Sequence, residues 1–503
     1  MLAVLTPAEM AARDAAAIAG GVSEAALVER AGGAVARGAR RLLGGTYGRR
    51  VVIVCGKGNN GADGRVAGRR LAAWGSRVVR FDLAGRSGGA ALDRAGLERA
   101  LGRADLAVDA MFGTGFQGPL AGDAAFAADA LTAAHCPVLA VDIPSGVDGL
   151  TGAVPGRAVE AVATVCLAAL KPGLVFHPGA ALAGDVEVRD IGIDVHTPPP
   201  LLGVTEEADV AAWIPRRPPE SHKWSVGGVY VVGGSQGMTG APMMTSRAAL
   251  RAGAGIVVTG LPGDAAARAS GGEVITRSLP ATSSGALDEG AAKEVLDGLD
   301  RFRALVVGPG LGRHPATVAA VRRLVAEAPV PLVLDADGLN ALDGDVELLA
   351  GRPAATVVTP HAGEYARLAG EPVGDDRVAA ARALAERAGA VVVLKGSRTV
   401  VAAPSGQAAV NTTGGPWLAT AGTGDVLSGV VGALTALGLP AFRAAAAGAW
   451  LHGRAADRAG HAGLVAGDLI DALPAVLAAL GAEPAATGHG RDRNHPNHPE
   501  RPE

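Results

Sequence analysis

The stretch AGTGDVLSGVVGAL, residues 421–434, places a glycine-rich turn and an aspartate immediately before an apolar helix. The amides of Gly422–Gly424 can point at a phosphate, because the first turn of a helix has free N–H groups and the positive end of the helix dipole. Asp425 then lies close enough to accept a proton from a substrate hydroxyl. The structural alternative is that Asp425 caps the helix and the glycines only form a turn. We favour a site for phosphate chemistry.

A rare lysine upstream supports this interpretation. The chain has only five lysines, and LKGSRT, residues 394–399, puts Lys395 at the end of a predicted strand, before glycine and hydroxyl groups. Together the two stretches predict a cradle for nucleotide phosphates. Four further loops follow predicted strands in this half: GGSQGMTGAP (233–242), GPGLG (308–312), DADGLNAL (335–342) and TPHAGE (359–364). His361 either serves as a structural histidine or lines a substrate site beside Glu364.

Short β-branched runs alternate with alanine-rich stretches along the whole chain, which is the pattern of parallel sheets with crossover helices. We therefore expect the α/β class, with one three-layer α/β/α sandwich in each half. The strands expected in the first half are residues 51–55, 77–81, 105–109, 138–142 and 163–167. Those expected in the second half are residues 228–232, 255–259, 304–308, 331–335, 355–359 and 390–394.

Three loops of the first half also follow predicted strands. They are GKGNNGADG (56–64), DAMFGTGFQGP (109–119) and DIPSGVDG (142–149). Ligands bind in open α/β sheets where the strands end, so we expect these loops to converge. One aspartate can then act as acid and base while another, with hydroxyl and amide oxygens, holds a cation. The structural alternative is that Asp109 and Asp142 only cap turns.

Length and charge restrict the class of protein. A chain of 503 residues exceeds one hydrophobic core, so we expect domains at 1–205 and 206–482 and a disordered tail at 483–503. Residues 196–224, rich in proline and charge, are expected to form an irregular linker. A net charge of -3 argues against a nucleic-acid partner. Residues 426–442 predict a buried helix rather than a membrane span.

The three cysteines and the N-terminus carry no export signal. Cys55, Cys136 and Cys166 are widely spaced in apolar sequence, which indicates reduced core thiols without a disulfide framework or zinc spacing. The first residues lack a basic region followed by a long apolar run. We expect a cytoplasmic protein, and we expect a homo-oligomer.

The first-half motifs resemble the N-terminal domain of the NAD(P)H-hydrate epimerase family over roughly residues 5–200. The resemblance implies a Rossmann-like fold, Asp142 as the acid and base, and K⁺ held by Asn60, Asp109 and Ser145. It also implies that a set of loop residues binds the hydrate: Asn59, Asn60, Gly61, Ala62, Asp63, Gly113, Thr114, Gly115, Phe116, Gln117, Gly118 and Pro119. Ala62 stands where the family usually has glycine, and its methyl group should be tolerated unless the position needs a positive φ.

The second half resembles the ribokinase-like superfamily and, within it, the NAD(P)H-hydrate dehydratases, over roughly residues 206–482. The resemblance implies that Ala241, Gly310, His361 and Asp425 contact the hydrate. It also implies that the adenine nucleotide is contacted by Lys395, Gly396, Ser397, Arg398, Thr399 and Gly424. The family commonly has His-Lys-Gly where this chain has His222, Lys223 and Trp224, which puts any role of this entrance loop in doubt.

The two resemblances together imply repair of hydrated NADH and NADPH. The first half would interconvert the R and S epimers, and the second would dehydrate the S epimer with Mg²⁺ and ADP, which becomes AMP and phosphate. NADHX, NADPHX and ADP would be the small-molecule substrates. One alternative is a small-molecule kinase in the second half. Another is a first half that is a silent binding module, as in relatives that resemble RNA-decapping scaffold proteins.

Overall fold

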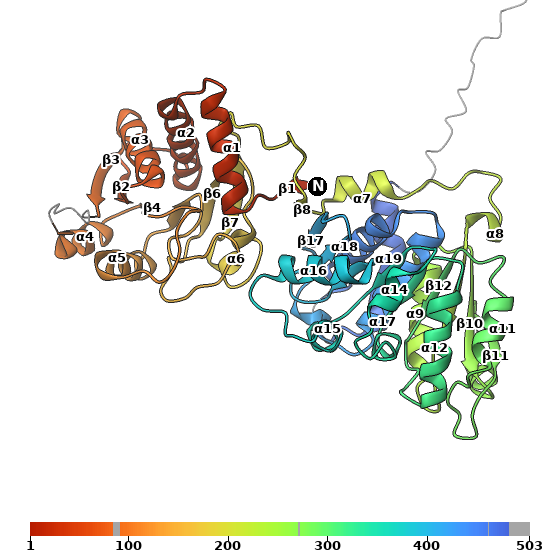
Figure 1. The fold of residues 1–503 in the computed structure, drawn as a ribbon. Coiled ribbons are helices and arrows are strands. Elements are labelled where there is room, and N and C mark those ends of the chain that lie inside the picture. Colours follow the sequence, from red (N-terminus) through yellow and green to blue (C-terminus); the bar gives the residue numbers. More distant parts are fainter. Residues whose placement is uncertain (84–90, 270–271, 461, 482–503) are drawn as a thin grey trace, which may run out of the picture.

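The computed structural model describes residues 1–83, 91–269, 272–460 and 462–481, and Figure 1 shows two α/β bodies joined beside the N-terminus. The expected tail at 483–503 lies outside the described residues. The strands of the first sheet are β2 (Arg50–Cys55), β3 (Arg77–Asp82), β4 (Leu106–Ala110), β5 (Val138–Val141), β6 (Ala163–Leu167) and β7 (Asp185–Arg189). The helices of this half are α1 (Pro7–Ala19), α2 (Glu24–Leu43), α3 (Asn59–Ala73), α4 (Arg94–Leu101), α5 (Gly122–Thr132), α6 (Gly179–Leu182) and the 3₁₀ turn η1 (Pro172–Leu174).

The first sheet is parallel throughout, in the order β3-β2-β4-β5-β6-β7. Alternate residues of a strand point to opposite faces, and β2 follows this rule. Val51, Ile53 and Cys55 pack in one core with α2, whereas Val52 and Val54 pack in another with α4 and α5. Both faces of the sheet are therefore covered by helices, which confirms the expected three-layer arrangement.

The second half holds a larger sheet. Its strands are β1 (Leu2–Ala3), β8 (Leu202–Val204), β9 (Gly228–Val232), β10 (Ile256–Pro262), β11 (Ile275–Leu279), β12 (Ala304–Val307), β13 (Leu332–Leu334), β14 (Thr356–Val358), β15 (Val391–Leu394), β16 (Thr399–Ala402) and β17 (Ala408–Asn411). Their order is β1-β8-β17-β16-β15-β14-β13-β12-β9-β10-β11. Strand β16 is antiparallel to both its neighbours, and β9 to β15 are parallel.

Helices cover both faces of this sheet as well. They are α7 (Glu207–Trp213), α8 (Lys223–Val226), α9 (Gly240–Arg251), α10 (Ala265–Arg268), α11 (Ala291–Asp297), α12 (Pro315–Glu327), α13 (Asp337–Asn340), α14 (Glu347–Ala350), α15 (Ala362–Ala369), α16 (Arg377–Ala388), the 3₁₀ turn η2 (Pro416–Leu418), α17 (Thr423–Ala436), α18 (Ala441–Ala459) and α19 (Ala466–Ala479). In β9, Val229 and Val231 face α9, α17 and α18, whereas Tyr230 and Val232 face α11 and α12.

The two halves share strands and a core. Strand β1 pairs with β8, and β8 pairs with β17, so residues from both ends of the first half extend the second sheet. One apolar cluster contains Ile143 and Phe176 of the first half together with Val204 and Val410 of that sheet. The division at residues 205 and 206 stays a prediction, but the halves are interlocked rather than merely tethered.

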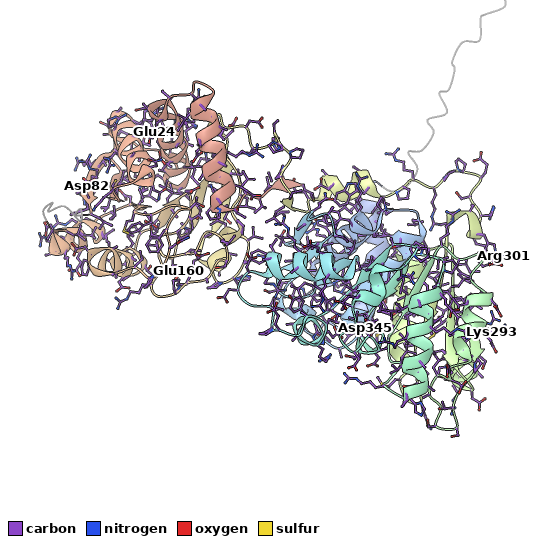
Figure 2. The ribbon with its side chains drawn as sticks, in the orientation of Figure 1. Glu24, Asp82, Glu160, Lys293, Arg301 and Asp345 are labelled. Atoms are coloured by element: carbon purple, nitrogen blue, oxygen red, sulfur yellow. The ribbon has the colours of Figure 1, made fainter. Side chains whose placement is uncertain are left out.

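The expected irregular linker at 196–224 is wrong in part, because β8, α7 and the start of α8 lie within it. Val210 of α7 is fully buried against the second core, so apolar burial outweighs the local proline content. Trp224 packs edge-on against Phe302, with ring centroids 5.4 Å apart. The guanidinium of Arg301, labelled in Figure 2, lies 5.7 Å from the Trp224 ring centroid. This contact accounts structurally for a tryptophan at the entrance loop.

The buried helix expected at 426–442 is confirmed only as far as Ala436, where α17 ends; residues 437–440 are not helical, and Phe442 belongs to α18. Every residue of α17 after Asp425 is buried, in the middle of the second core. Among the described residues, no helix is both long and apolar enough to cross a bilayer.

We expect Gly429→Ala to destabilise the second half. A Cβ at this position of α17 would lie 2.0 Å from the carbonyl oxygen of Thr245 in α9, so the two helices would have to separate. Overpacking of this kind costs about 1–3 kcal/mol. The measurement is urea denaturation, with Gly467→Ala in α19 as the control, because a Cβ there meets nothing within 4 Å. Equal stability of the two variants would contradict the close packing of α17 on α9.

Candidate active sites

A cavity of about 1100 Å³ opens where β2 and β4 end. These strands are neighbours, but β2 continues to β3 on one side and β4 to β5 on the other, which makes this the switch point of the sheet. The cavity is lined by residues of all three predicted loops, among them Asn59, Asn60, Asp63, Gly113, Thr114, Gly115, Phe116, Gln117, Pro119 and Asp142. Gly61, Ala62 and Gly118, which were also predicted to bind the hydrate, are not among the lining residues. Glu24, labelled in Figure 2, lines the cavity from the first turn of α2.

The residues from Asn59 to Asp63 form the first turn of α3 rather than a loop. A Cβ at Gly61 would lie 1.9 Å from the carbonyl oxygen of Gly56, so only glycine lets this turn approach the end of β2. Ala62 is helical and is not among the residues with positive φ, so its methyl group is tolerated. The turn presents Asn60 and Asp63, both buried, towards the cavity.

Asn60, Asp109 and Ser145 are brought together around Phe112. The amide nitrogen of Asn60 donates to the Phe112 carbonyl at 2.8 Å, and the Phe112 N–H donates to the Ser145 hydroxyl oxygen at 3.0 Å. Asp109 is fully buried and accepts from the backbone N–H and the hydroxyl of Ser145, both at 2.7 Å. Burial raises the pKa of Asp109 to about 6. The hydrogen bonds from Ser145 and one from the Met111 N–H act in the opposite direction and lower the pKa. No cation of the described residues pairs with Asp109.

Asp142 forms a buried ion pair that the sequence did not reveal. The Lys171 ammonium contacts Asp142 Oδ1 and donates to the Leu167 carbonyl at 2.6 Å. Burial alone would lower the pKa of Lys171, but the charge of Asp142 raises it, so the lysine stays charged. Asp142 has φ 67°, which ends β5 one residue earlier than expected and turns the carboxylate into the cavity. The rarity of lysine in this chain was the available signal for Lys171.

In the second half, Asp425 lies in the first turn of α17, as predicted. Gly422 precedes the helix with φ 89°, a conformation that favours glycine. The side chain of Asp425 has no hydrogen bond to the described residues, so it is not the cap that the structural alternative required. Burial and the charge of Asp335 raise the pKa of Asp425 to about 6, and the charge of Lys395 opposes this rise.

Asp335 is a further residue of this site, and sequence reasoning assigned it no role. It is buried at the end of β13 and accepts hydrogen bonds from Lys395, at 2.9 Å, and from the Ser428 hydroxyl. Burial alone would raise the pKa of Asp335, but the charge of Lys395 and these hydrogen bonds lower it overall. Glu364 lies 3.7 Å from the same ammonium. Lys395 is thus fixed beside Gly424: a Cβ built on this glycine would lie 3.6 Å from the Lys395 Nζ.

Other predicted residues of the second half have their own partners. His361 caps α15: its Nδ1 accepts from the Gly363 and Glu364 N–H groups at 3.0 and 3.3 Å, while the ring stays exposed. Gly310 has φ 68°, and a Cβ built on it would lie 3.5 Å from that of Ala241, so these two predicted residues are neighbours. A substrate contact at these positions stays a prediction.

The predicted nucleotide loop also contacts the first half. The guanidinium of Arg398 donates to the Val175 carbonyl at 3.0 Å and to the Thr412 carbonyl at 2.9 Å. Gly396 and Ser397 are exposed, and the Thr399 hydroxyl donates to the Gly396 carbonyl at 3.4 Å. The loop is therefore held at the junction of the two halves by Arg398, and nucleotide binding by these residues stays a prediction.

Two family models match the chain. The model described as NAD(P)H-hydrate dehydratase matches residues 229–475, and the model described as YjeF-related protein N-terminus matches residues 24–101 and 89–173. A solved structure of the ADP/ATP-dependent NAD(P)H-hydrate dehydratase from Bacillus subtilis, co-crystallised with ATP/Mg²⁺, is 29% identical. The match covers 55% of this chain and 98% of that chain, with a TM-score of 0.48.

Relatives with both halves match nearly the whole chain. The bifunctional NAD(P)H-hydrate repair enzyme of Moorella thermoacetica is 43% identical over 497 residues, which cover 90% of this chain and 92% of the relative. The enzyme of the same name from Escherichia coli is 34% identical over 461 residues, which cover 85% of this chain and 84% of the relative.

We expect Lys171→Met to destabilise the first half by about 3–5 kcal/mol, because it leaves the carboxylate of Asp142 buried without a counter-ion. The side chain of Lys171 is 1% exposed and that of Asp142 is 11% exposed. The double variant Lys171→Met/Asp142→Asn should recover most of this loss. Chemical denaturation of the single and double variants measures the coupling, and a loss for Lys171→Met that the second substitution fails to reduce would contradict the ion pair.

Proposed function

Because the chain belongs to the family of bifunctional NAD(P)H-hydrate repair enzymes, we propose that it epimerises R- and S-NAD(P)HX and dehydrates S-NAD(P)HX to NAD(P)H. The observation that carries the proposal is a pair of carboxylates in one chain: Asp142 lines the cavity where parallel strands end, and Asp425 lies in the first turn of α17 beside Lys395 and Asp335. A dehydratase that accepts one epimer leaves the other unused. An epimerase fused to it supplies that missing epimer.

In the first half, the cavity between α1, α3 and the end of β4 accepts the damaged nicotinamide ring. The 59–63 turn and the 113–119 loop surround the ring, and Asp142 acts as the acid and base in the inversion of the hydroxyl-bearing carbon. The Lys171 ammonium supplies the counter-charge that the buried carboxylate of Asp142 needs. The Thr114 N–H donates to Asp142 Oδ2 at 3.3 Å, which fixes the carboxylate with one side towards the cavity.

Asn60, Asp109 and Ser145 have the donor set that a K⁺ ion needs. Buried carboxylate, amide and hydroxyl oxygens are hard ligands, and Asp109 is a buried carboxylate without a cation among the described residues. The residues present therefore fit the ion. K⁺ would supply positive charge that favours the ionised form of Asp109 and would hold the Phe112 turn in place.

In the second half, Asp425 takes the proton of the ring hydroxyl, which attacks the terminal phosphorus of ADP and releases AMP. The amides of Gly422–Gly424 and the Lys395 ammonium face the charge that develops on the phosphoryl group. Mg²⁺, when bound with the nucleotide, neutralises part of its phosphate charge. Phosphate is a good leaving group where hydroxide is a poor one. Its elimination from the ring restores the dihydronicotinamide.

The adenine nucleotide is assigned to Lys395–Thr399 and Gly424, and the hydrate to Ala241, Gly310, His361 and Asp425. ADP is proposed as the phosphoryl donor. The cytoplasmic location, the homo-oligomer and the expectation of no nucleic-acid or membrane partner stay predictions from the sequence.

Asp142→Asn and Asp425→Asn should separate the two activities. With a mixture of both epimers, ADP and Mg²⁺, the native chain should restore the absorbance of the reduced cofactor completely. Asp142→Asn should stop once the S epimer is consumed, because epimerisation loses about 100-fold or more without its proton acceptor. Asp425→Asn should restore no absorbance yet still interconvert the epimers, as followed by chromatography.

The outcomes distinguish the alternatives. Consumption of nucleotide by the native chain without return of absorbance would instead identify a small-molecule kinase. An unchanged rate of epimer interconversion in Asp142→Asn would leave the first half as a binding module. Asp105→Asn, at a half-exposed residue before the start of β4, is the matched control and should behave as the native chain.

The dehydratase rate should depend on pH through Asp425. Its pKa is raised to about 6, and the base form is the carboxylate, so activity is retained above this pH and lost below it. We expect kcat/KM for the S epimer to fall about tenfold for each pH unit below that value. Circular dichroism at each pH checks that the fold persists, and a rate that stays constant about one pH unit below it would contradict Asp425 as the base.

A further inference from the structure

The first-half cavity contains more carboxylates than its one buried lysine can pair with. Asp14 from α1, Asp63 from α3 and Asp142 after β5 all line it, and Lys171 pairs with Asp142. Lys57 lines the cavity too, but its side chain is exposed and has no ion pair among the described residues. Glu24 and Asp123 line the cavity as well, and Asp123 pairs with Arg94. The one buried cation thus pairs with one of five acidic groups.

Asp63 is the group left without compensation. Its residue is 5% exposed, and its carboxyl has no hydrogen bond or ion pair with any described residue, although it faces the cavity. Burial raises the pKa of Asp63 to about 8, and the charges of Asp142 and Asp14 add to this effect. A carboxyl with such a pKa carries a proton at neutral pH.

The other described ionisable groups around α3 supply no positive charge that pairs with Asp63. On α2, Glu29 pairs with Arg69 and Arg70 of α3 on the outer face, and Arg30 donates to the Ile191 carbonyl. The remaining ionisable groups near the cavity are Glu24 of α2, Asp123 of α5, Cys55 of β2, Asp109 of β4 and Cys166 of β6. None of these groups is a cation that could keep Asp63 ionised.

We propose that Asp63 is a second catalytic residue of the epimerase site, the proton donor that works with Asp142 as proton acceptor. The proposal rests on the proposed function of the first half and adds a role that substrate binding alone does not give. Two carboxyl groups line one cavity, one paired with a lysine ammonium and one buried without a partner among the described residues, and such unlike environments are how one site comes to hold an acid and a base.

The reaction balances with these two groups. The bond between the ring carbon and its hydroxyl oxygen breaks, the Asp63 proton converts the departing oxygen into water, and the lone pair of the ring nitrogen forms a C=N bond. A second water then attacks the opposite face. Its oxygen bonds to the carbon, its proton goes to Asp142, and the C=N electrons return to nitrogen. In the reverse inversion, Asp142 donates the proton and Asp63 accepts it. After either direction, proton exchange with solvent returns both carboxyl groups to their starting protonation states.

Asp63→Asn tests the proposal in the full-length chain. The purified R epimer is supplied with ADP, Mg²⁺ and saturating K⁺, and the second half reports each inversion by restoring absorbance. We expect Asp63→Asn to lose about 100-fold or more of the R-epimer rate. The rate with the S epimer should stay native, which shows that the variant is folded. Loss of R-epimer activity of less than about tenfold would overturn the proposal.

Two further measurements separate proton donation from binding. The native R-epimer rate should fall above pH of about 8, and Asp14→Asn should move this fall to lower pH by removing a like charge. In isotopically labelled water, each inversion should place one labelled oxygen on the product. An unmoved pH limit or retention of the original oxygen would overturn the role of Asp63. A native chain that fails to convert the R epimer would instead overturn the proposed epimerase function.

Discussion

The structure depends on burying an ionised aspartate where parallel strands end. Removing a carboxylate from water costs several kcal/mol unless a counter-ion and hydrogen bonds accompany it. Each half of the chain meets this requirement with one lysine, Lys171 for Asp142 and Lys395 for Asp335. Burial alone would lower the pKa of both lysines, and the neighbouring carboxylates raise it instead. Two of the five lysines in the chain are used in this way.

Each ion pair has a second carboxyl group near it, Asp63 in the first half and Asp425 in the second, and the pKa values of these two groups differ. In the first half, burial, together with the charges of Asp142 and Asp14, raises the pKa of Asp63 to about 8. In the second, Lys395 opposes the effect of burial and of Asp335, so the pKa of Asp425 rises only to about 6. The same arrangement thus yields an acid in the first half and a base in the second at neutral pH. The charge of Lys395 lowers the pKa of Asp425, whereas no cation of the described residues lowers that of Asp63.

Local motifs predicted the α/β class, eleven of the strands and the convergence of three loops at one cavity, because buried parallel strands and the glycine turns after them have strong sequence patterns. The strands that were missed are β1, β7, β8, β11, β16 and β17. β1 and β8 have only two and three residues, and β7 and β11 are largely unburied, so they lack the apolar run of a central strand. Lys171 and Asp335 were missed as site residues because their role comes from a partner 29 or 60 residues away. His361 and Arg398 were predicted as ligand contacts, and the structure gives both a structural partner as well.

The pairing of β1, β8 and β17 has a consequence for how the chain can be divided. A fragment cut at residue 205 would remove β8 from the second sheet and expose the backbone N–H and C=O groups of β17, an edge that favours aggregation. The complementary fragment would carry β1 and β8 with no sheet to join. A C-terminal piece that begins before residue 202 would therefore keep the pairing of β8 with β17 and lose only that of β1 with β8.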